Sequence, residues 1–236
     1  MAIGKEIFSL ENTIGYKFSD VKHLETALTH SSYSNEKKSQ GIILSSNERL
    51  EFLGDSVLEI VISEILFERY KKRSEGVLTK MRQHLVCEKT LARIAFSISL
   101  GDYLNLGNGE EASECRKRPK VLADALEALF GAIYIDSFRS LDSSKKVILS
   151  LFAEEIEKSS DMQRGDYKTM LQELVEKEGS SVLEYRVVEE FGPEHNKTFK
   201  IEALINNNVV GVGISSNKKD AEMQAARLAL SLFGVK

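Results

Sequence analysis

The chain has 236 residues, of which 42% are hydrophobic and 29% charged, and its 32 Lys and Arg against 36 Asp and Glu give a net charge of -4. This length and apolar content suffice for two ordinary domains. The negative balance excludes attraction of nucleic acid by the overall field, so phosphate contacts must come from local basic patches. No signal-type apolar run and no segment of membrane-spanning length is present, which predicts a cytoplasmic protein without a membrane partner.

The first part of the chain is predicted to be all-α. Apolar residues recur at helical spacing up to residue 157, and a polar run at 158–165 predicts a linker before a second domain at 166–236. Residues 36–46 are expected to form a loop. The expected helices span 21–29, 47–70, 78–98, 121–138 and 143–156.

One face of the predicted helix 47–70 carries three acids. Glu48, Glu51 and Asp55 fall within about 60° of one another at helical spacing, and like charges so placed repel unless a cation lies between them. Glu59 lies near the same wedge, so spacing alone does not define a ligand set. A solvated outer face is the alternative, and the apolar residues that flank the acids argue against it.

A second acidic site lies on the predicted helix 121–138. Asp124 and Glu127 are the only charged residues between Val121 and Ile135, among small residues that let another helix approach closely. An unpaired buried carboxylate costs several kcal/mol or becomes neutral. Hydrogen bonds to Arg, Ser or backbone groups are one solution. A metal site shared between the two acidic helices is the other, and we favour it.

Carboxylates and water suit a hard ion, so Mg²⁺ is expected, with Mn²⁺ as an alternative and no organic cofactor. No Glu-x-x-His pair supports a di-iron site, and the four histidines are too scattered for zinc. Cys87 and Cys115 lack metal-site spacing and are expected to be unpaired thiols. The basic runs 116–120 and 71–73 are candidate phosphate contacts, the first because it leads into the second acidic helix.

The second domain is predicted to be a small α+β module of order α-β-β-β-α. Helical spacing at 167–178 gives way to alternation from 183 to 214, with a turn at 206–208. Nine Lys and Arg stand against eleven Asp and Glu, so its overall field does not attract RNA. A last helix is expected, with an apolar face made of Ala221, Ala225, Leu228, Ala229 and Leu232.

Residues 47–58, Asn-Glu-Arg-Leu-Glu-Phe-Leu-Gly-Asp-Ser-Val-Leu, resemble the signature of the ribonuclease III family. Residues 27–30 before it, Asp124 and Glu127 after it, and a trailing module similar to a double-stranded-RNA-binding domain extend the resemblance over nearly the whole chain. It implies a magnesium-dependent homodimeric endonuclease that cuts both strands of duplex RNA. The family leaves 5'-phosphate and 3'-hydroxyl ends with short 3' overhangs, and usually processes ribosomal RNA precursors and messenger RNA.

The resemblance also implies roles for single residues. Asp55 and Glu127 would be catalytic and, with Glu51 and Asp124, would hold the metal. Glu48 and Glu75 match auxiliary acids, and Phe52 matches an aromatic residue that contacts the partner subunit. The RNA contacts would be Gln172, Glu173, His195, Lys218 and Lys219.

Asp220 stands where relatives commonly carry a basic residue, so we expect weaker but still salt-sensitive RNA binding by this module. Two other functions compete with nuclease activity. One is a noncatalytic duplex-RNA protein that keeps the fold as a dimer scaffold, against which the intact acid set argues. The other is a helical metal-storage or redox protein, which the trailing module disfavours.

Overall fold

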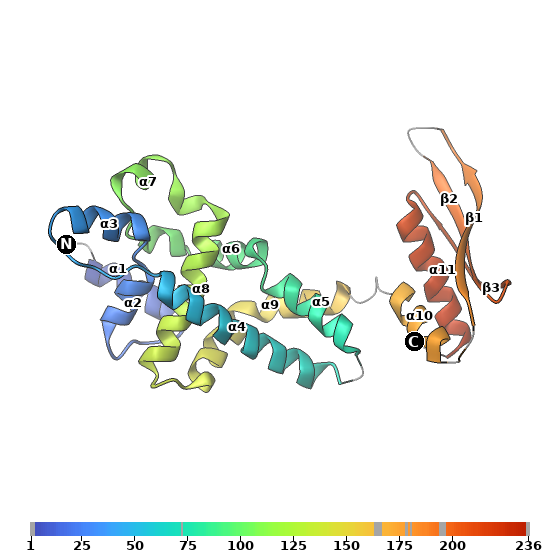
Figure 1. Cartoon of the computed structure of the whole chain (residues 1–236), viewed down its shortest axis with the longest axis horizontal. Coiled ribbons are helices and arrows are strands. Elements are labelled where there is room, and N and C mark those ends of the chain that lie inside the picture. The colour runs from blue at the N-terminus through green and yellow to red at the C-terminus, as the bar shows by residue number, and fades with distance from the viewer. Residues whose placement is uncertain are drawn as a thin grey trace. The chain divides into compact units, whose positions relative to one another are not determined.

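The structure is a computed structural model that describes residues 3–71, 73–162, 167–177, 179, 181–193 and 197–234. Its contacts divide the chain into Met1–Ser159 and Ser160–Lys236. The first unit is helical, and the second has one helix, three strands and a final helix, so both predicted fold classes are confirmed (Figure 1). The helices of the first unit are α1 (Ile3–Ile14), α2 (Val21–Ala27), α3 (Ser31–Ser39), α4 (Glu48–Arg69), α5 (Glu75–Leu85), α6 (Glu88–Ser97), α7 (Asn108–Ala112), α8 (Pro119–Asp136) and α9 (Leu141–Met162), with short 3-10 turns at Leu100–Tyr103 and Cys115–Lys117.

Helix α8 lies at the centre of the first unit, packed against α2, α4 and α6 (Figure 1). Its small residues allow this, because most of its length is buried, including Ala125, Ala128 and Ala132 at 0% exposure. Large side chains such as Phe130 and Phe152 fill the space around it and contact each other. The expectation that small residues on this helix admit a close neighbour is therefore correct.

Several helix predictions in this unit were wrong. The expected helix 78–98 is two helices, because Cys87 takes an extended backbone (φ -72°, ψ 151°) and caps α6. Helices α1, α3 and α7 were not predicted, and α3 extends into the expected loop 36–46. Its sequence Ser-Ser-Tyr-Ser-Asn-Glu-Lys-Lys-Ser has no apolar spacing to reveal it. The His30 side chain accepts a hydrogen bond from Ser32 N and so caps its first turn.

The predicted linker also needs correction, since α9 continues to Met162. Polar residues continue this helix because they find local partners. Lys158 forms ion pairs with Glu154 at 2.6 Å and Glu155 at 3.4 Å, and Ser159 donates a hydrogen bond to the carbonyl of Ile156. Residues 163–165 of the expected linker lie outside the described residues.

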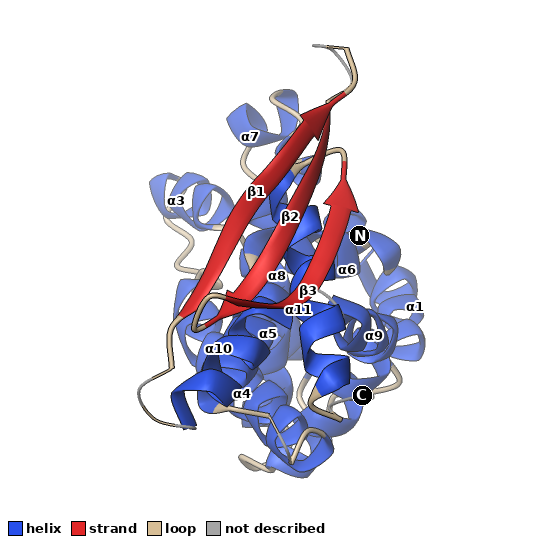
Figure 2. Cartoon of the chain, turned by 90° about the vertical axis from the view of Figure 1, so that its right-hand side faces the viewer, coloured by secondary structure: helices blue, strands red, loops and turns tan. Residues whose placement is uncertain are grey.

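The second unit is a three-stranded antiparallel sheet, order β1-β2-β3, with two helices. Figure 2 shows its strands side by side. Asn206 and Asn207 make the tight turn between β2 and β3 with left-handed backbone angles (φ 48° and 66°), which Asn tolerates. The elements are α10 (Tyr167–Lys177), β1 (Leu183–Phe191), β2 (Thr198–Ile205), β3 (Asn208–Ser215) and α11 (Lys218–Leu232).

The buried face of α11 differs from the prediction. Leu228 and Leu232 are 53% and 72% exposed, whereas Ala226 and Leu230 are buried. The reason lies in β3, where Gly211 and Gly213 approach the backbone of α11 so closely that a methyl group would meet carbonyl oxygens at 2.1 and 1.9 Å. The backbone atoms of α11 at these contacts belong to Ala221, Ala225 and Ala229, which are all fully buried, so this side of the helix faces the strand.

Candidate metal centre

Helices α4 and α8 cross at two glycines. A methyl group on Gly54 of α4 would lie 1.8 Å from the backbone oxygen of Glu127, and one on Gly131 of α8 would lie 2.2 Å from the oxygen of Leu50. The two backbones are therefore in direct contact. Figure 1 shows the two helices crossing, and at this crossing Glu51 of α4 lies near Asp124 and Glu127 of α8. Neither glycine was recognised as a site residue from the sequence, although each lies within four residues of a predicted ligand.

The crossing brings Glu51 together with Asp124 and Glu127. One carboxylate oxygen from each of the three lies within 4.8 Å of the others, and all three side chains are half-buried. These are three of the four predicted metal ligands. The i, i+3 spacing of the α8 pair puts both on one face, opposite Glu51.

No hydrogen bond or ion pair is formed by these three carboxylates within the described part of the chain. The fully buried acids among the described residues of this unit do have partners. Buried Asp136 accepts hydrogen bonds from the Tyr16 hydroxyl at 2.8 Å and from two backbone N–H groups, and buried Glu11 accepts one from Phe18 N at 2.8 Å. The alternative raised by the sequence was that the buried acids are hydrogen-bonded to Arg, Ser or backbone groups. Such bonds are found at Asp136 and Glu11 but not in the cluster of Glu51, Asp124 and Glu127.

Burial raises the pKa of all three carboxyl groups, and mutual repulsion adds to this for Glu127 and Glu51. Burial, followed by repulsion from Asp55, Glu51 and Asp124, raises the pKa of Glu127 to about 8. Burial and then the charge of Asp124 raise the pKa of Glu51, and burial raises the pKa of Asp124. With a pKa of about 8, Glu127 keeps a proton at neutral pH in the metal-free protein, and cation binding would favour its loss.

Asp55 and Glu48 lie at the exposed border of the cluster. Asp55 is exposed and outside the group of three, but its charge contributes to the raised pKa of both Glu127 and Glu51. Glu48 is also exposed, accepts a hydrogen bond from Ser46 Oγ at 2.9 Å, and contributes to the raised pKa of Glu51. Both acids thus act on the cluster through their charge.

The basic run 116–120 is mostly neutralised by a neighbouring acidic run. Its ion pairs are Arg116–Glu111 at 2.7 Å, Lys117–Glu114 at 3.1 Å and Arg118–Glu110 at 3.1 Å. Lys120 differs, because its charge lowers the pKa of Glu51 and of Asp124. The expected phosphate patch is thus reduced to one lysine beside the acids, four residues before Asp124 on α8.

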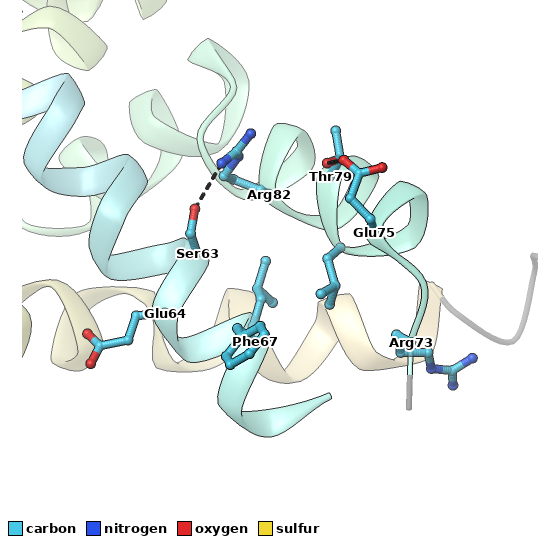
Figure 3. A pocket seen from close by; sticks show the side chains of 9 residues that line it. Ser63, Glu64, Phe67, Arg73, Glu75, Thr79 and Arg82 are labelled. Atoms are coloured by element: carbon cyan, nitrogen blue, oxygen red, sulfur yellow. Dashed lines mark hydrogen bonds between the residues drawn. The ribbon is translucent and has the colours of Figure 1, made fainter. Parts of the chain in front are cut away.

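Glu75 lies in a separate place, at the first residue of α5. It lines a pocket of about 600 Å³ between α4 and α5, together with Phe67, Thr79 and Arg82. Figure 3 shows Glu75 and Thr79 on one wall and the Arg82–Ser63 hydrogen bond of 2.9 Å joining the two helices. The Thr79 hydroxyl donates to Glu75 at 2.8 Å. Within one chain, this predicted auxiliary acid does not join the cluster.

The predicted RNA contacts lie on three elements of the second unit. Gln172 on α10 is exposed and donates to Glu176 at 2.8 Å, and its neighbour Glu173 is half-buried. Lys218 and Lys219 are exposed at the start of α11. His195 lies outside the described residues.

Asp220 has a structural role at the start of α11. The Asn217 side chain accepts a hydrogen bond from Asp220 N at 2.8 Å, while the Asp220 carboxylate accepts one from Asn217 Nδ2 at 2.6 Å. The pair caps the helix, and a negative charge in a first turn is favourable. This accounts for the acid that departs from the expected basic pattern.

Helix α4 exposes large apolar side chains, among them Phe52, for which the sequence predicted a contact with a partner subunit. Phe52, Ile60 and Phe67 are 79%, 51% and 72% exposed. At about 100° per residue they fall within roughly 80°, so they form one apolar face. An exposed apolar face of this kind marks an interaction site.

The two cysteines are free thiols, Cys87 half-buried and Cys115 buried. In the part of the chain that the structure describes, no helix combines the length and the apolar content that crossing a bilayer needs.

Comparisons with known proteins cover both units. The family described as "Ribonuclease-III-like" matches residues 20–156, and the "Double-stranded RNA binding motif" matches residues 167–232. "Ribonuclease 3" of Caldanaerobacter subterraneus is 47% identical over 96% of this chain and 97% of its own length, and that of Natranaerobius thermophilus is 45% identical over 95% of each. The crystal structure of the ribonuclease III nuclease domain from Campylobacter jejuni is 40% identical, with a TM-score of 0.58 over 64% of this chain and 96% of that one.

A helical nuclease domain with an acidic cluster able to hold a metal, followed by a duplex-RNA-binding motif, defines an endoribonuclease that acts on double-stranded RNA. Identity above 40% over nearly the whole of two relatives makes the assignment specific. The chain belongs to the ribonuclease III family. This result removes the metal-storage alternative raised by the sequence.

Proposed function

We propose that this protein cleaves duplex RNA with Mg²⁺, or with Mn²⁺ in its place, and leaves 5'-phosphate and 3'-hydroxyl ends with short 3' overhangs. The observation that carries the proposal is the set of half-buried carboxylates of Glu51, Asp124 and Glu127, which form no hydrogen bond or ion pair within the described residues. Hard divalent cations bind oxygen ligands of this kind. By analogy with the family, ribosomal RNA precursors and messenger RNA are the substrates, and the cytoplasm is the site of action.

Glu51, Asp124 and Glu127 would hold the cation, with Asp55 added from the exposed border. Held by these residues, a divalent cation would supply an activated water molecule and positive charge beside the phosphate oxygens, on which negative charge develops during in-line displacement. Asp55 and Glu127 are proposed as the catalytic pair, because the charge of Asp55 acts on Glu127 in the structure. Glu48 would support the site through its charge. Glu75 would contact RNA or a second metal ion.

The second unit, which we assign to 166–236, would hold the duplex by its shape. Gln172 and Glu173 would face one minor groove, His195 the next, and Lys218 with Lys219 the phosphates between them, across about 16 base pairs. These contacts recognise A-form geometry and 2'-hydroxyls.

Incubation with long duplex RNA tests the proposed function. We expect cutting into short duplexes with magnesium, no cutting after excess chelator, and recovery when magnesium is returned, with 5'-phosphate ends detected by labelling. Single-stranded RNA of the same sequence is the control and should remain intact. Binding without cutting in magnesium would support the noncatalytic duplex-RNA protein instead.

The proposed homodimer rests on the apolar face of Phe52, Ile60 and Phe67. We propose that a second copy of the chain packs against this face, because the solved Campylobacter jejuni nuclease domain has a region involved in dimer formation.

We expect Phe52→Asp to convert a dimer into a monomer at micromolar concentration, because a charge would replace an apolar contact. Analytical ultracentrifugation measures this. Phe96→Asp, at a side chain 70% exposed on α6, is the matched control and should stay dimeric. A dimeric Phe52→Asp protein would contradict the proposal.

A further inference from the structure

One of the expected RNA-binding lysines is held by an acid of its own domain. Lys218, the first residue of α11, places its Nζ 3.0 Å from Glu190 Oε1 and 5.0 Å from the centre of the Phe199 ring. Lys197 approaches the same carboxylate, with Nζ at 3.9 Å. Glu190 is therefore the anionic partner of two lysines.

The strand pairing explains this arrangement. Glu190 on β1 and Phe199 on β2 are directly opposite each other in the antiparallel register. Opposed residues project from the same face of a sheet, so the carboxylate and the ring lie next to each other. Lys218 contacts both, which means that the start of α11 lies over this end of the sheet. Three elements thus position one ammonium group.

We infer that Glu190 competes with RNA phosphate for Lys218 and so weakens binding of duplex RNA. This inference rests on the proposed role of Lys218 in holding phosphates. A phosphate that reached the ammonium would come close to the Glu190 carboxylate, and the two like charges would repel. The pair can open, because the side chains of Lys218 and Glu190 are 53% and 41% exposed.

The charge balance of the domain makes the Lys218–Glu190 ion pair important for RNA binding. Nine Lys and Arg stand against eleven Asp and Glu in residues 166–236, and several of these cations are already engaged. Lys168 forms an ion pair with Glu222 at 2.5 Å, and Lys200 lies 3.9 Å from Glu189. A domain with little free positive charge depends strongly on each lysine that can meet a phosphate.

Binding of the full chain to a short labelled RNA duplex, measured in chelator over a series of salt concentrations, tests the inference. Glu190→Gln keeps the shape of the side chain and frees Lys218, so its affinity should rise about three- to tenfold at low salt. The slope of log affinity against log salt should steepen by about one, the value of one phosphate contact.

Glu189→Gln is the matched control. It removes the same charge from the neighbouring residue, whose side chain projects from the opposite face and pairs only loosely with Lys200. Its affinity should change less than about twofold. In a Lys218→Gln background, most of the gain from Glu190→Gln should vanish, because the second lysine, Lys197, lies farther from this carboxylate, at 3.9 Å.

Suppose that the wild-type protein binds duplex RNA and that Glu190→Gln binds it equally well or more weakly. This result would overturn the inference and leave the proposed function standing. An equal gain from Glu189→Gln would also overturn it, because the effect would then be one of net charge. Failure of the unchanged protein to bind duplex RNA would overturn the proposed function and this inference together.

Discussion

Glu127→Gln is expected to abolish cleavage of duplex RNA and to leave binding of the duplex intact. Its carboxylate lies with Glu51 and Asp124 between the crossing helices, and an amide cannot supply the same charge to a cation. A lost metal ligand removes several kcal/mol of transition-state stabilisation, so the rate should fall by about a thousandfold or more. The cleavage rate of duplex RNA in saturating magnesium measures the loss of activity, and the affinity for duplex RNA in chelator shows whether binding is retained.

Glu59→Gln is the matched control for this experiment. Glu59 is an exposed acid on α4, the helix of Glu51, where spacing alone allowed it as a ligand, and it lies outside the cluster. Its variant should cut at the normal rate. If Glu127→Gln cut at the normal rate with magnesium, the assignment of Glu127 as a metal ligand would be wrong.

The Glu127→Gln substitution should also stabilise the metal-free protein against unfolding at alkaline pH. The folded pKa of Glu127 is about 8 against 4.5 for an ordinary glutamate, so the folded state binds more protons between these values. Stability of the unchanged protein therefore falls as the pH rises from about 4.5 to about 8. Glu127→Gln avoids this loss, worth about 2 to 4 kcal/mol above pH 8 after allowance for partial exposure. Thermal melts with chelator, between pH 5 and pH 9, should show the two proteins diverging.

Gly54→Ala is expected to be the most damaging small substitution in the nuclease domain. The added methyl group would lie 1.8 Å from the Glu127 carbonyl oxygen and 2.9 Å from Gly131 N, both backbone atoms that no rotamer change can move. The helices must separate, which costs about 2 to 4 kcal/mol. The melting temperature should fall by roughly 5 to 15 °C. Cutting should be lost even in the folded fraction, because Glu51 moves away from the two acids of α8.

Gly76→Ala provides the comparison. This glycine lies in the first turn of α5, and a methyl group there would have no neighbour within 4 Å. Alanine is the better helix former, so the variant should be as stable as the unchanged protein or more stable by about 0.5 to 1 kcal/mol. A Gly54→Ala protein that melted and cut like Gly76→Ala would show that direct backbone contact does not hold α4 against α8.

The sequence by itself indicated the acids that we propose as metal ligands and catalytic residues. Helical spacing put Glu51 and Asp55 on one face of their helix, and the isolation of Asp124 and Glu127 among apolar residues marked the second acidic site. The alternation after residue 183 predicted the three strands, and residues 47–58 indicated the family. These signals are visible because each is a property of one local segment.

Only the tertiary structure decided which of these residues meet. The contact of Gly54 with α8 selects Glu51 for the cluster and leaves Asp55 at its border, and no spacing within one helix contains that information. The pairing of the basic run 116–118 with nearby acids, the capping role of Asp220 and the capture of Lys218 by Glu190 are likewise contacts between side chains. Periodicity describes the face of one element, whereas a site depends on which faces are brought together and how closely the backbones approach.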